Sequence, residues 1–334
     1  MKHIEQNIVE TLKQNYMPYA MSVIISRAIP EIDGLKPSHR KLLFTMYKMG
    51  LLKGAKTKSA NVVGQTMKLN PHGDQAIYET LVRLTTGNAA LLHPLVESKG
   101  NFGRVYSRDM KYAAPRYTEV KLADISAELF RDIDKDTVDF TDNYDGTMKE
   151  PMLLPTVFPN ILVNPNQGIA VGMASNICSF NLREVCETAI AYIKNDNINL
   201  LDYLKAPDFS TGGDLIVSSK ELERIYETGR GSFKVRARYR VDKKNSYIEI
   251  YEIPYTTTAE AIIDAIADLV KSGKIKDISD VRDETDLKGL KITLDVKRST
   301  DPEALMNKLF KLTPLEDSFN CNFNILVNGI PQVL

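Results

Sequence analysis

The stretch that decides the fold of the first part of this chain runs from Lys58 to Thr85 and reads KSANVVGQTMKLNPHGDQAIYETLVRLT. Two short helical patterns, about 58–68 and 75–85, are separated by a turn that contains a proline and a glycine. Asp74 suits the N-cap position of the second helix. Two short helices with a tight turn between them predict a helix-turn-helix unit.

Helical patterns also flank this unit. One is expected at about 38–50 with Pro37 in its first turn, and an N-terminal helix at Ile4–Gln14 should end at Pro18. Residues 98–117 are rich in Gly and Tyr and lack periodicity, which predicts a loop or wing. A further helix is expected at 119–133 because Leu122, Ile125, Leu129 and Ile133 share one helical face.

From Pro151 the composition of the sequence changes. Four prolines within fifteen residues predict a domain boundary there (Pro151, Pro155, Pro159 and Pro165). Beyond it, helical patterns alternate with strand-like runs, which predicts an α+β or α/β second domain. The helices are expected at 182–194, 219–228, 258–272 and 302–312, and the strands at 233–240, 247–253 and 290–296.

The formal net charge of the 334 residues is zero, but the charge is unevenly distributed. Residues 1–121 hold 18 Lys and Arg against 9 Asp and Glu, and the remainder holds 25 against 34. The segment 36–58 carries seven basic residues and no acid. Such a block predicts a basic face that binds nucleic acid, although a solvated lysine-rich helix remains an alternative. The acidic stretch 124–150 is expected to be a solvated helix and loop rather than a metal cluster.

Several classes of protein are disfavoured by what the sequence lacks. No apolar run is long enough for a membrane span, and the first residues do not resemble a signal peptide, so a cytosolic protein is expected. The three cysteines form no CxxC pair, and there is no Walker A, GxGxxG, HExxH or GxSxG motif. The four histidines are too dispersed for a metal set, so no metal ligands are predicted, and His3 and His93 are interpreted as structural.

Arg116 and Tyr117 form a candidate catalytic pair. A phenol has a pKa near ~10 and becomes a useful nucleophile towards phosphate only when a base or a cation assists it. Arg116 could supply that cation and stabilise a pentacoordinate phosphorus. One Arg-Tyr pair among fifteen tyrosines is weak evidence on its own, and a tyrosine packed at the base of the wing is the alternative.

Ordered motifs over nearly the whole chain decide between these interpretations. They are Tyr19-Ala20-Met21-Ser22-Val23-Ile24, Arg27-Ala28-Ile29-Pro30, Asp33-Gly34-Leu35-Lys36-Pro37, His39-Arg40, Lys58-Ser59-Ala60, Pro71-His72-Gly73-Asp74, Gly100-Asn101-Phe102-Gly103, Arg116-Tyr117-Thr118-Glu119, Gly168-Ile169-Ala170-Val171-Gly172, Thr211-Gly212-Gly213 and Glu252-Ile253-Pro254-Tyr255. With these motifs the chain resembles the A subunits of bacterial type IIA DNA topoisomerases, namely those of DNA gyrase and topoisomerase IV.

The resemblance implies an α+β fold in three parts: an arm at 1–25 that contacts the B subunit, a winged-helix DNA-gate domain at 26–150, and an α/β tower domain at 151–334. It implies that Tyr117 is the nucleophile that cuts DNA through a 5′-phosphotyrosyl link, assisted by Arg116. The family continues past Leu334 into a coiled coil, a second dimer gate and a C-terminal domain, so the chain matches the N-terminal breakage-reunion part.

Further residues match family positions that contact DNA or drugs. The expected DNA contacts are Arg27, Lys36, His39, Arg40, Lys41, His72 and Ile169. Ile169 matches an apolar residue that wedges between base pairs, while a buried strand isoleucine is the alternative. Gln75 and Glu79 occupy positions that line the quinolone pocket.

The resemblance also implies partners. Double-stranded DNA would be the substrate, and the A subunit would work as a homodimer with two B subunits (A2B2). The B subunit would hold the catalytic Mg²⁺ and the ATP, in the cytoplasm and at the nucleoid. Supercoiling by a gyrase and decatenation by a topoisomerase IV are not distinguished. Two other classes of protein remain as alternatives: a non-catalytic winged-helix regulator, and a phosphotransferase that uses Tyr117 on small substrates.

Two residues and one loop depart from the family pattern. Asn70 replaces a histidine, and Gln75 replaces a small hydroxyl residue, which should weaken the water-bridged quinolone contact. The loop 103–116 is about two residues longer than usual and contains two rival tyrosines, Tyr106 and Tyr112. Tyr117 is preferred because it alone carries the Arg-Tyr-Thr-Glu context.

Overall fold

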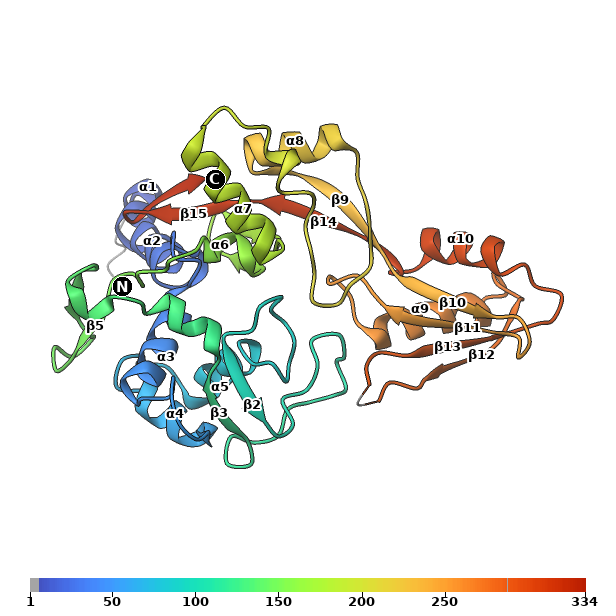
Figure 1. Cartoon of the computed structure of the whole chain (residues 1–334), viewed down its shortest axis with the longest axis horizontal. Helices are drawn as coiled ribbons and strands as arrows, with labels where there is room; N and C mark the ends of the chain where they lie inside the picture. The colour runs from blue at the N-terminus through green and yellow to red at the C-terminus, as the bar shows by residue number, and fades with distance from the viewer. Residues whose placement is uncertain (1–5, 287) are drawn as a thin grey trace.

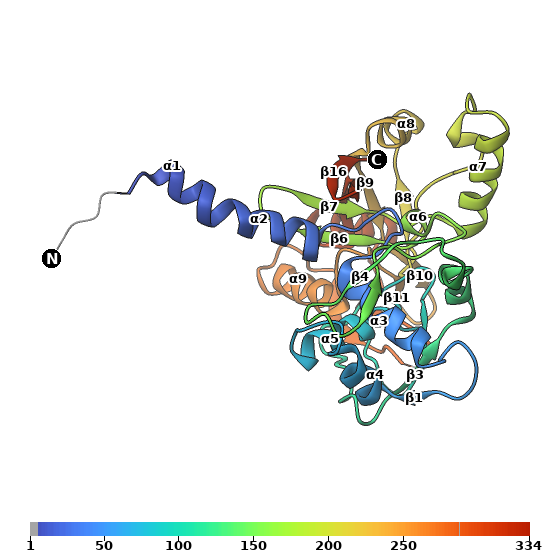
Figure 2. The ribbon, with the colours of Figure 1, turned by 90° about the vertical axis from the view of Figure 1, so that its left-hand side faces the viewer.

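The computed structural model describes residues 6–286 and 288–334. It shows a body from which a lobe extends on one side, made of β10–β13 with α9 and α10 (Figure 1). The N-terminal helix projects away from the body on another side (Figure 2). Within the described residues, no helix is long and apolar enough to cross a membrane.

The N-terminal helix is longer than predicted. It runs through α1 (Ile8–Thr11), a π-helical segment (Leu12–Tyr16), α2 (Met17–Val23) and a second π-helical segment (Ile24–Ala28). The prediction that Pro18 ends the helix was wrong. A proline removes one hydrogen-bond donor and crowds the preceding turn, and the wider π turn just before Pro18 accommodates both effects. Residues 1–5, which include His3 and the predicted helix start at Ile4, lie outside the described residues.

The three helices predicted around the decisive stretch are confirmed. They are α3 (Pro37–Lys48), α4 (Ser59–Thr66) and α5 (Asp74–Arg83). Asp74 is the first residue of α5 rather than its cap, which is Gly73. The helices pack on a three-stranded antiparallel sheet of order β1-β3-β2 (β1 Thr57–Lys58, β2 Val96–Lys99, β3 Glu119–Leu122). Their shared core is made of residues such as Leu43, Val62 and Leu81.

The prediction of a helix at 119–133 was wrong. Residues 119–122 form β3, and only short 3₁₀ turns follow at Asp124–Leu129 and Ile133–Lys135. Val120 and Leu122 alternate inward with period 2, and β3 pairs with a strand on each side, so tertiary pairing overrides the helical spacing. The acidic stretch contains no long helix either, and carries instead a hairpin of β4 (Phe140–Asp142) and β5 (Lys149–Pro151).

The chain after residue 151 builds two sheets. One has five strands in the order β6-β7-β14-β9-β8, and the other has four in the order β10-β11-β13-β12. Their strands are β6 (Asn166–Ile169), β7 (Ala174–Ile177), β8 (Asp214–Ile216), β9 (Arg230–Arg236), β10 (Arg238–Asp242), β11 (Tyr247–Glu252), β12 (Ile278–Asp283), β13 (Ile292–Val296) and β14 (Glu316–Asn322). A last hairpin pairs β15 (Asn324–Val327) with β16 (Ile330–Val333).

The helices of this part were predicted closely. They are α6 (Asn160–Val163), α7 (Leu182–Lys194), α8 (Ser219–Thr228), α9 (Ala259–Lys271) and α10 (Pro302–Leu312), together with a 3₁₀ turn at Leu200–Asp202. All four predicted helices are present, and only the short α6 was missed. Every pairing between the described strands is antiparallel, so the fold is α+β throughout, and the expected α/β character of the second part was wrong.

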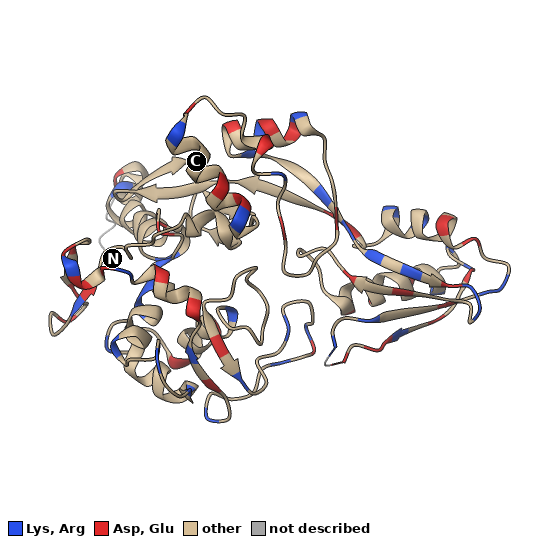
Figure 3. Cartoon of the chain, in the orientation of Figure 1, with Lys and Arg blue, Asp and Glu red and all other residues tan. Residues whose placement is uncertain are grey.

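Each sheet after residue 151 has its own buried cluster. Around the five-stranded sheet, Phe233 and Phe319 stack at 5.3 Å between ring centroids. Around the four-stranded sheet, α9 and α10 cover one face through residues such as Ile266 and Leu309. Lys, Arg, Asp and Glu positions recur along the strands of this sheet (Figure 3). Both Arg240 and Lys291 pair with Glu249.

Candidate active site

Tyr117 lies in a turn between β2 and β3, and its side chain is 66% exposed. Its backbone N–H donates to the carbonyl of Ala114 at 2.9 Å, which closes the turn. The guanidinium carbon of Arg116 lies 4.8 Å from the centre of the Tyr117 ring. The two residues therefore present a phenol and a cation together at the surface, as a reaction at a phosphate would require.

The backbone on both sides of Tyr117 is held firmly. Thr118 is completely buried, and its hydroxyl lies 2.8 Å from the Ser59 hydroxyl and 2.9 Å from the Tyr78 hydroxyl. The Ser59 N–H donates to the Thr118 carbonyl at 3.0 Å, and Tyr78 donates to the Ala113 carbonyl at 2.7 Å. The tyrosine thus has a free side chain on a backbone that α4 and α5 fix in place.

The two rival tyrosines are engaged elsewhere. The hydroxyl of Tyr112 accepts from Gln75 at 3.0 Å and donates to Glu79 at 3.2 Å. Burial and the Glu79 carboxylate raise its pKa, which makes this phenol a poorer nucleophile. Tyr106 packs against the buried cluster under α9. Of the three candidates, Tyr117 presents its phenol most openly.

Lys36 and His39 stand at the start of α3, close to Arg83 at the end of α5. Burial, followed by the charge of Arg83, lowers the pKa of Lys36 to about 8. Burial lowers the pKa of His39 to about 3, and the nearby cations Lys36, Arg83 and Arg40 add to this effect. His39 is therefore neutral at pH 7 and offers hydrogen bonds rather than a charge.

Sequence reasoning missed Arg83. The sequence shows a basic residue in the last turn of a helix, but no local signal shows that this turn faces the start of α3. The packing of α5 against α3 brings the two together and adds a cation to the group formed by Lys36 and His39.

Arg40 and Lys41 serve the fold. Arg40 is 4% exposed and makes two hydrogen bonds with Asp33, at 2.7 and 2.9 Å. Asp33 also accepts the backbone N–H of Leu154 at 3.0 Å, so this buried ion pair joins distant segments. Lys41 donates to the carbonyl of Leu69 at 3.0 Å and pairs with Glu150 at 3.2 Å. Protein carboxylates thus pair with both cations, and the DNA contacts expected of Arg40 and Lys41 stay a prediction.

Ile169 lies at the end of β6, in the hairpin with β7, and its side chain is 80% exposed. The alternative that it is a buried strand isoleucine was therefore wrong. The preceding Gly168 packs directly on the backbone of Ala28, where a Cβ would collide with the Ala28 carbonyl. Lys36 donates to the carbonyl of Gln167 at 2.6 Å. The fold thereby brings Ile169, Lys36 and the exposed Arg27 together from segments far apart in the sequence.

The turn before α5 presents His72 to solvent, whereas Asn70 is buried. The His72 N–H donates to the Asn70 carbonyl at 2.8 Å. At the start of α5, Gln75 donates to Glu79 at 2.7 Å, and both contact Tyr112 as described above. Asn70 thus lies inside the fold rather than at its surface.

Among residues 6–286 and 288–334, no group of three or more His, Cys, Asp and Glu side chains is arranged to hold a metal ion. Burial lowers the pKa of His93, and its backbone N–H donates to the Asn164 side chain at 2.8 Å, which fits a structural role.

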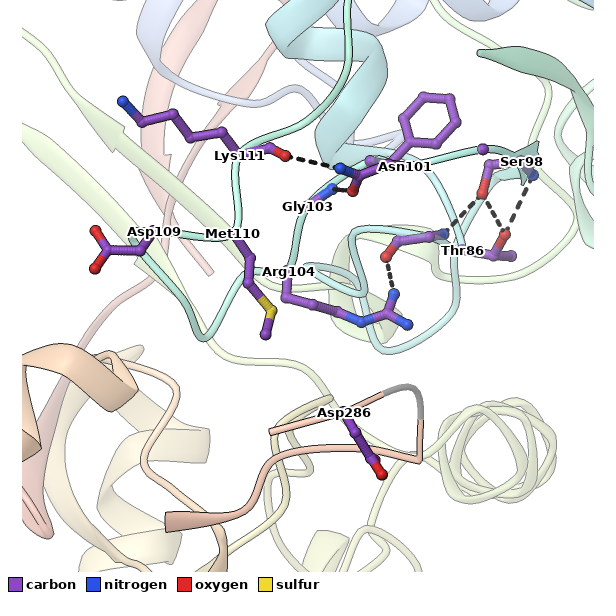
Figure 4. Close-up of a pocket in the computed structure, with 12 residues that line it drawn as sticks. Thr86, Ser98, Asn101, Gly103, Arg104, Asp109, Met110, Lys111 and Asp286 are labelled. Carbon is purple, nitrogen blue, oxygen red and sulfur yellow. Dashed lines mark hydrogen bonds between the residues drawn. The ribbon is translucent and has the colours of Figure 1, made fainter. Parts of the chain in front are cut away.

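A cavity of about 890 Å³ lies beside the loop that leads to Tyr117 (Figure 4). Asn101 braces that loop by donating to the Lys111 carbonyl at 3.1 Å and accepting the Gly103 N–H at 2.9 Å. Asp286, from the lobe of the four-stranded sheet, borders the opposite side. The loop therefore runs along the junction between two parts of the molecule.

Comparison with known proteins identifies the family. The family model for the A subunit of DNA gyrase/topoisomerase IV matches residues 27–334. The chain belongs to the family of DNA gyrase/topoisomerase IV A subunits. As a member, it is 44% identical over 336 residues to the DNA gyrase A subunit of Borreliella burgdorferi, covering 98% of this chain and 41% of that relative.

Other members of the gyrase/topoisomerase IV A subunit family give similar values. The DNA gyrase A subunit of Ureaplasma parvum is 44% identical over 339 residues, covering 99% of this chain and 40% of that relative. For Staphylococcus aureus the identity is 42% over 340 residues, with 99% and 38% covered. The chain thus spans about two fifths of the length of these curated relatives.

Proposed function

We propose that this chain is the DNA-cleaving part of the A subunit of an ATP-dependent type IIA topoisomerase, with Tyr117 as the nucleophile. The observation that carries this proposal is the exposed Tyr117 phenol beside Arg116, on a backbone fixed by Thr118. A nucleophile held in this way loses little freedom when it attacks, which favours the reaction.

The chemistry is an exchange of one phosphate ester for another. The Tyr117 oxygen bonds to the phosphorus of a DNA phosphodiester while the bond from phosphorus to the 3′ oxygen breaks. The phenol loses a proton and the leaving 3′ oxygen gains one, so the 5′ end stays on the tyrosine. Arg116 stabilises the negative charge that builds up on the phosphate oxygens. Because the ester is retained, the reverse attack reseals the strand.

The proposed domain division follows the three parts that the family implies. Residues 26–150 would form a winged-helix DNA-gate domain, a proposal that α3–α5 and their three-stranded sheet support. Residues 151–334 would form the tower. Residues 1–25 would be an arm that contacts the B subunit, and the exposed apolar side chains of Ile8 and Leu12 favour such a partner.

The proposed DNA contacts are the exposed or half-buried residues around the start of α3 and the hairpin β6–β7. Arg27, Lys36 and His72 would bind phosphates, and His39 would add a neutral hydrogen bond. Ile169 would insert between base pairs and bend the duplex. Arg83 is added to this set because it lies close enough for its charge to lower the pKa of both Lys36 and His39. Arg40 and Lys41 are left out because each is paired with a carboxylate, Asp33 and Glu150 respectively.

The proposed assembly is a homodimer with two B subunits, acting on double-stranded DNA at the nucleoid in the cytoplasm. The B subunit would hold both the Mg²⁺ and the ATP. When present, the metal would polarise the scissile phosphate. Whether the assembled enzyme supercoils like a gyrase or decatenates like a topoisomerase IV would follow from assays of the two activities.

The proposed quinolone pocket at Gln75 and Glu79 is partly closed by Tyr112, which hydrogen-bonds to both residues. A drug would have to displace that hydroxyl. We therefore expect weak quinolone inhibition of the reconstituted enzyme, and stronger inhibition for the Gln75→Ser variant.

Plasmid cleavage tests the proposed function. The full-length protein, supplied with Mg²⁺ and its B subunit, should produce linear DNA with protein attached to the 5′ ends. Tyr117→Phe should abolish this product. Tyr106→Phe is the matched control, since it removes a rival phenol from the same loop, keeps the ring that packs under α9, and should preserve the attachment. Cleavage that survives Tyr117→Phe would refute the assignment.

A further inference from the structure

The loop 103–116 contacts the lobe of the four-stranded sheet through α9. The backbone N–H of Ala259, at the first position of α9, donates to the carbonyl of Tyr106 at 2.9 Å. The Tyr106 ring packs against the cluster beneath that helix. The loop that leads to Tyr117 therefore touches both the helices α3–α5 and a separate lobe.

Glu260 forms the centre of this contact. Its side chain is 8% exposed, and its carboxylate accepts hydrogen bonds from three consecutive loop residues. They are the Ser107 hydroxyl, the Arg108 N–H at 2.9 Å and the Asp109 N–H at 3.0 Å. Burial by itself would raise the pKa of Glu260, but the hydrogen bonds from the loop bring it down to about 2. A carboxylate so buried is stable as an anion only while those donors stay in place.

The other end of the same loop is held by the first part of the chain. Ala113 donates to the Asn101 carbonyl at 2.9 Å and accepts from Tyr78 at 2.7 Å. Tyr112 is bound to Gln75 and Glu79 on α5. Only Met110 and Lys111 separate the Glu260 contact from this second anchor. A displacement of residues 107–109 would therefore strain the hydrogen bonds of Tyr112 and Ala113, which precede the turn of Tyr117.

We propose that Glu260 is a positioning residue for DNA cleavage: by binding Ser107, Arg108 and Asp109, it fixes the loop that carries Tyr117 to the lobe of α9. This inference rests on the proposed function, because it concerns where the Tyr117 hydroxyl lies. It follows that movement of this lobe relative to α3–α5 would shift the tyrosine, so the two parts of the molecule are mechanically coupled at the cleavage site.

Asp264 provides an internal comparison. It lies one turn further along α9 and reaches the same loop, with 3.4 Å between its carboxylate and the Arg108 guanidinium. Both side chains are more than 60% exposed, so solvent screens the pair and it contributes little. The two acids thus share a helix and a loop but differ in burial.

The test compares Glu260→Gln with Asp264→Asn. Glutamine keeps the shape of the side chain but directs an NH₂ group at a donor, so at least one hydrogen bond is lost and the charge no longer strengthens the others. In the chain alone, trypsin should cut after Arg108 and Lys111 about tenfold faster in Glu260→Gln. Asp264→Asn should stay within about twofold of the wild type.

The second readout is DNA cleavage by the enzyme reconstituted with Mg²⁺ and its B subunit. In Glu260→Gln the rate of covalent attachment at Tyr117 should fall about tenfold, while the DNA concentration for half-saturation stays within about twofold. A general loss of structure would change both the attachment rate and the half-saturating DNA concentration. A change in the rate alone therefore indicates that Glu260 positions Tyr117.

Ser107→Ala is a second variant that tests the same contact if Glu260→Gln fails to fold. It removes one hydrogen-bond donor from the loop without disturbing α9. Its attachment rate should fall about threefold. If both variants behave as wild type while Tyr117→Phe abolishes cleavage, the role of Glu260 is overturned and the proposed function stands. If Tyr117→Phe still cleaves, the proposed function fails, and the trypsin rates still decide whether Glu260 holds the loop.

Discussion

Thr118 and Ser59 bind each other twice, once through their hydroxyls at 2.8 Å and once from the Ser59 N–H to the Thr118 carbonyl at 3.0 Å. The residue next to the proposed nucleophile is thereby fastened to the first residue of α4. This pair explains how an exposed tyrosine can occupy a defined position. The hydroxyls of Ser59, Thr118 and Tyr78 form one buried group, so each depends on the others.

Replacing Thr118 with valine should therefore destabilise the protein. The variant keeps the shape of the side chain but leaves the Ser59 and Tyr78 hydroxyls short of a partner, which costs about 1–3 kcal/mol. Urea unfolding monitored by circular dichroism measures the change in the free energy of unfolding. Thr80→Val is the control, because the Thr80 hydroxyl bonds only within α5 at the surface, and it should stay within about 0.5 kcal/mol. Equal stabilities for the two variants would contradict the buried group.

Ile169 and Ile177 form a matched pair in the hairpin β6–β7, one exposed and the other completely buried. Ile177→Ala should lower the free energy of unfolding by about 2–5 kcal/mol, since it opens a cavity in the core. Ile169→Ala should change it by less than about 0.5 kcal/mol. The same variant should reduce DNA bending, measured by energy transfer between dyes at the ends of a short duplex. Unchanged DNA bending by the Ile169→Ala variant would contradict the proposal that Ile169 inserts between base pairs.

His39 should make the stability depend on pH. Its pKa is about 3 in the folded state and near 6.5 when unfolded, so between these values the unfolded chain binds a proton that the folded chain does not. Stability should thus fall as the pH drops from 6.5 towards 3. His39→Gln should show a smaller loss over this range when urea unfolding is measured at pH 7.0, 5.5 and 4.5. A His39→Gln slope equal to that of the wild type would show that His39 is accessible to protons.

Arg27 and Arg40 should differ in their effect on DNA binding. Arg27 is exposed beside β6, so Arg27→Ala should reduce the slope of log affinity against log salt by about 1. Arg40→Ala should leave that slope unchanged and instead lower the free energy of unfolding by about 3–5 kcal/mol, because it leaves Asp33 buried without its partner. Fluorescence anisotropy across a salt series and urea unfolding separate the two effects. A reduced slope of log affinity against log salt for Arg40→Ala would indicate that Arg40 contacts DNA after all.

The local elements were predictable because their signals are local. The helices α3–α5 and α7–α10 lie within two residues of their predicted bounds, since apolar spacing, Pro37 and the turn before Asp74 act over a few neighbouring residues. Two of the failures have separate causes. The pairing of β3 with strands on both sides overrides a helical spacing, and a π turn lets the first helix pass Pro18.

The sequence by itself determined the family and, through Arg116-Tyr117-Thr118-Glu119, the candidate nucleophile. Only the tertiary structure decided which of the predicted cations are free. Arg40 is neutralised by Asp33, whereas Arg83 approaches Lys36 and His39 from another helix. It also decided that Glu260 holds a loop some 150 positions earlier in the chain. Such contacts depend on how distant segments pack, and burial then sets the charge and strength of each group, so no short stretch of sequence encodes them.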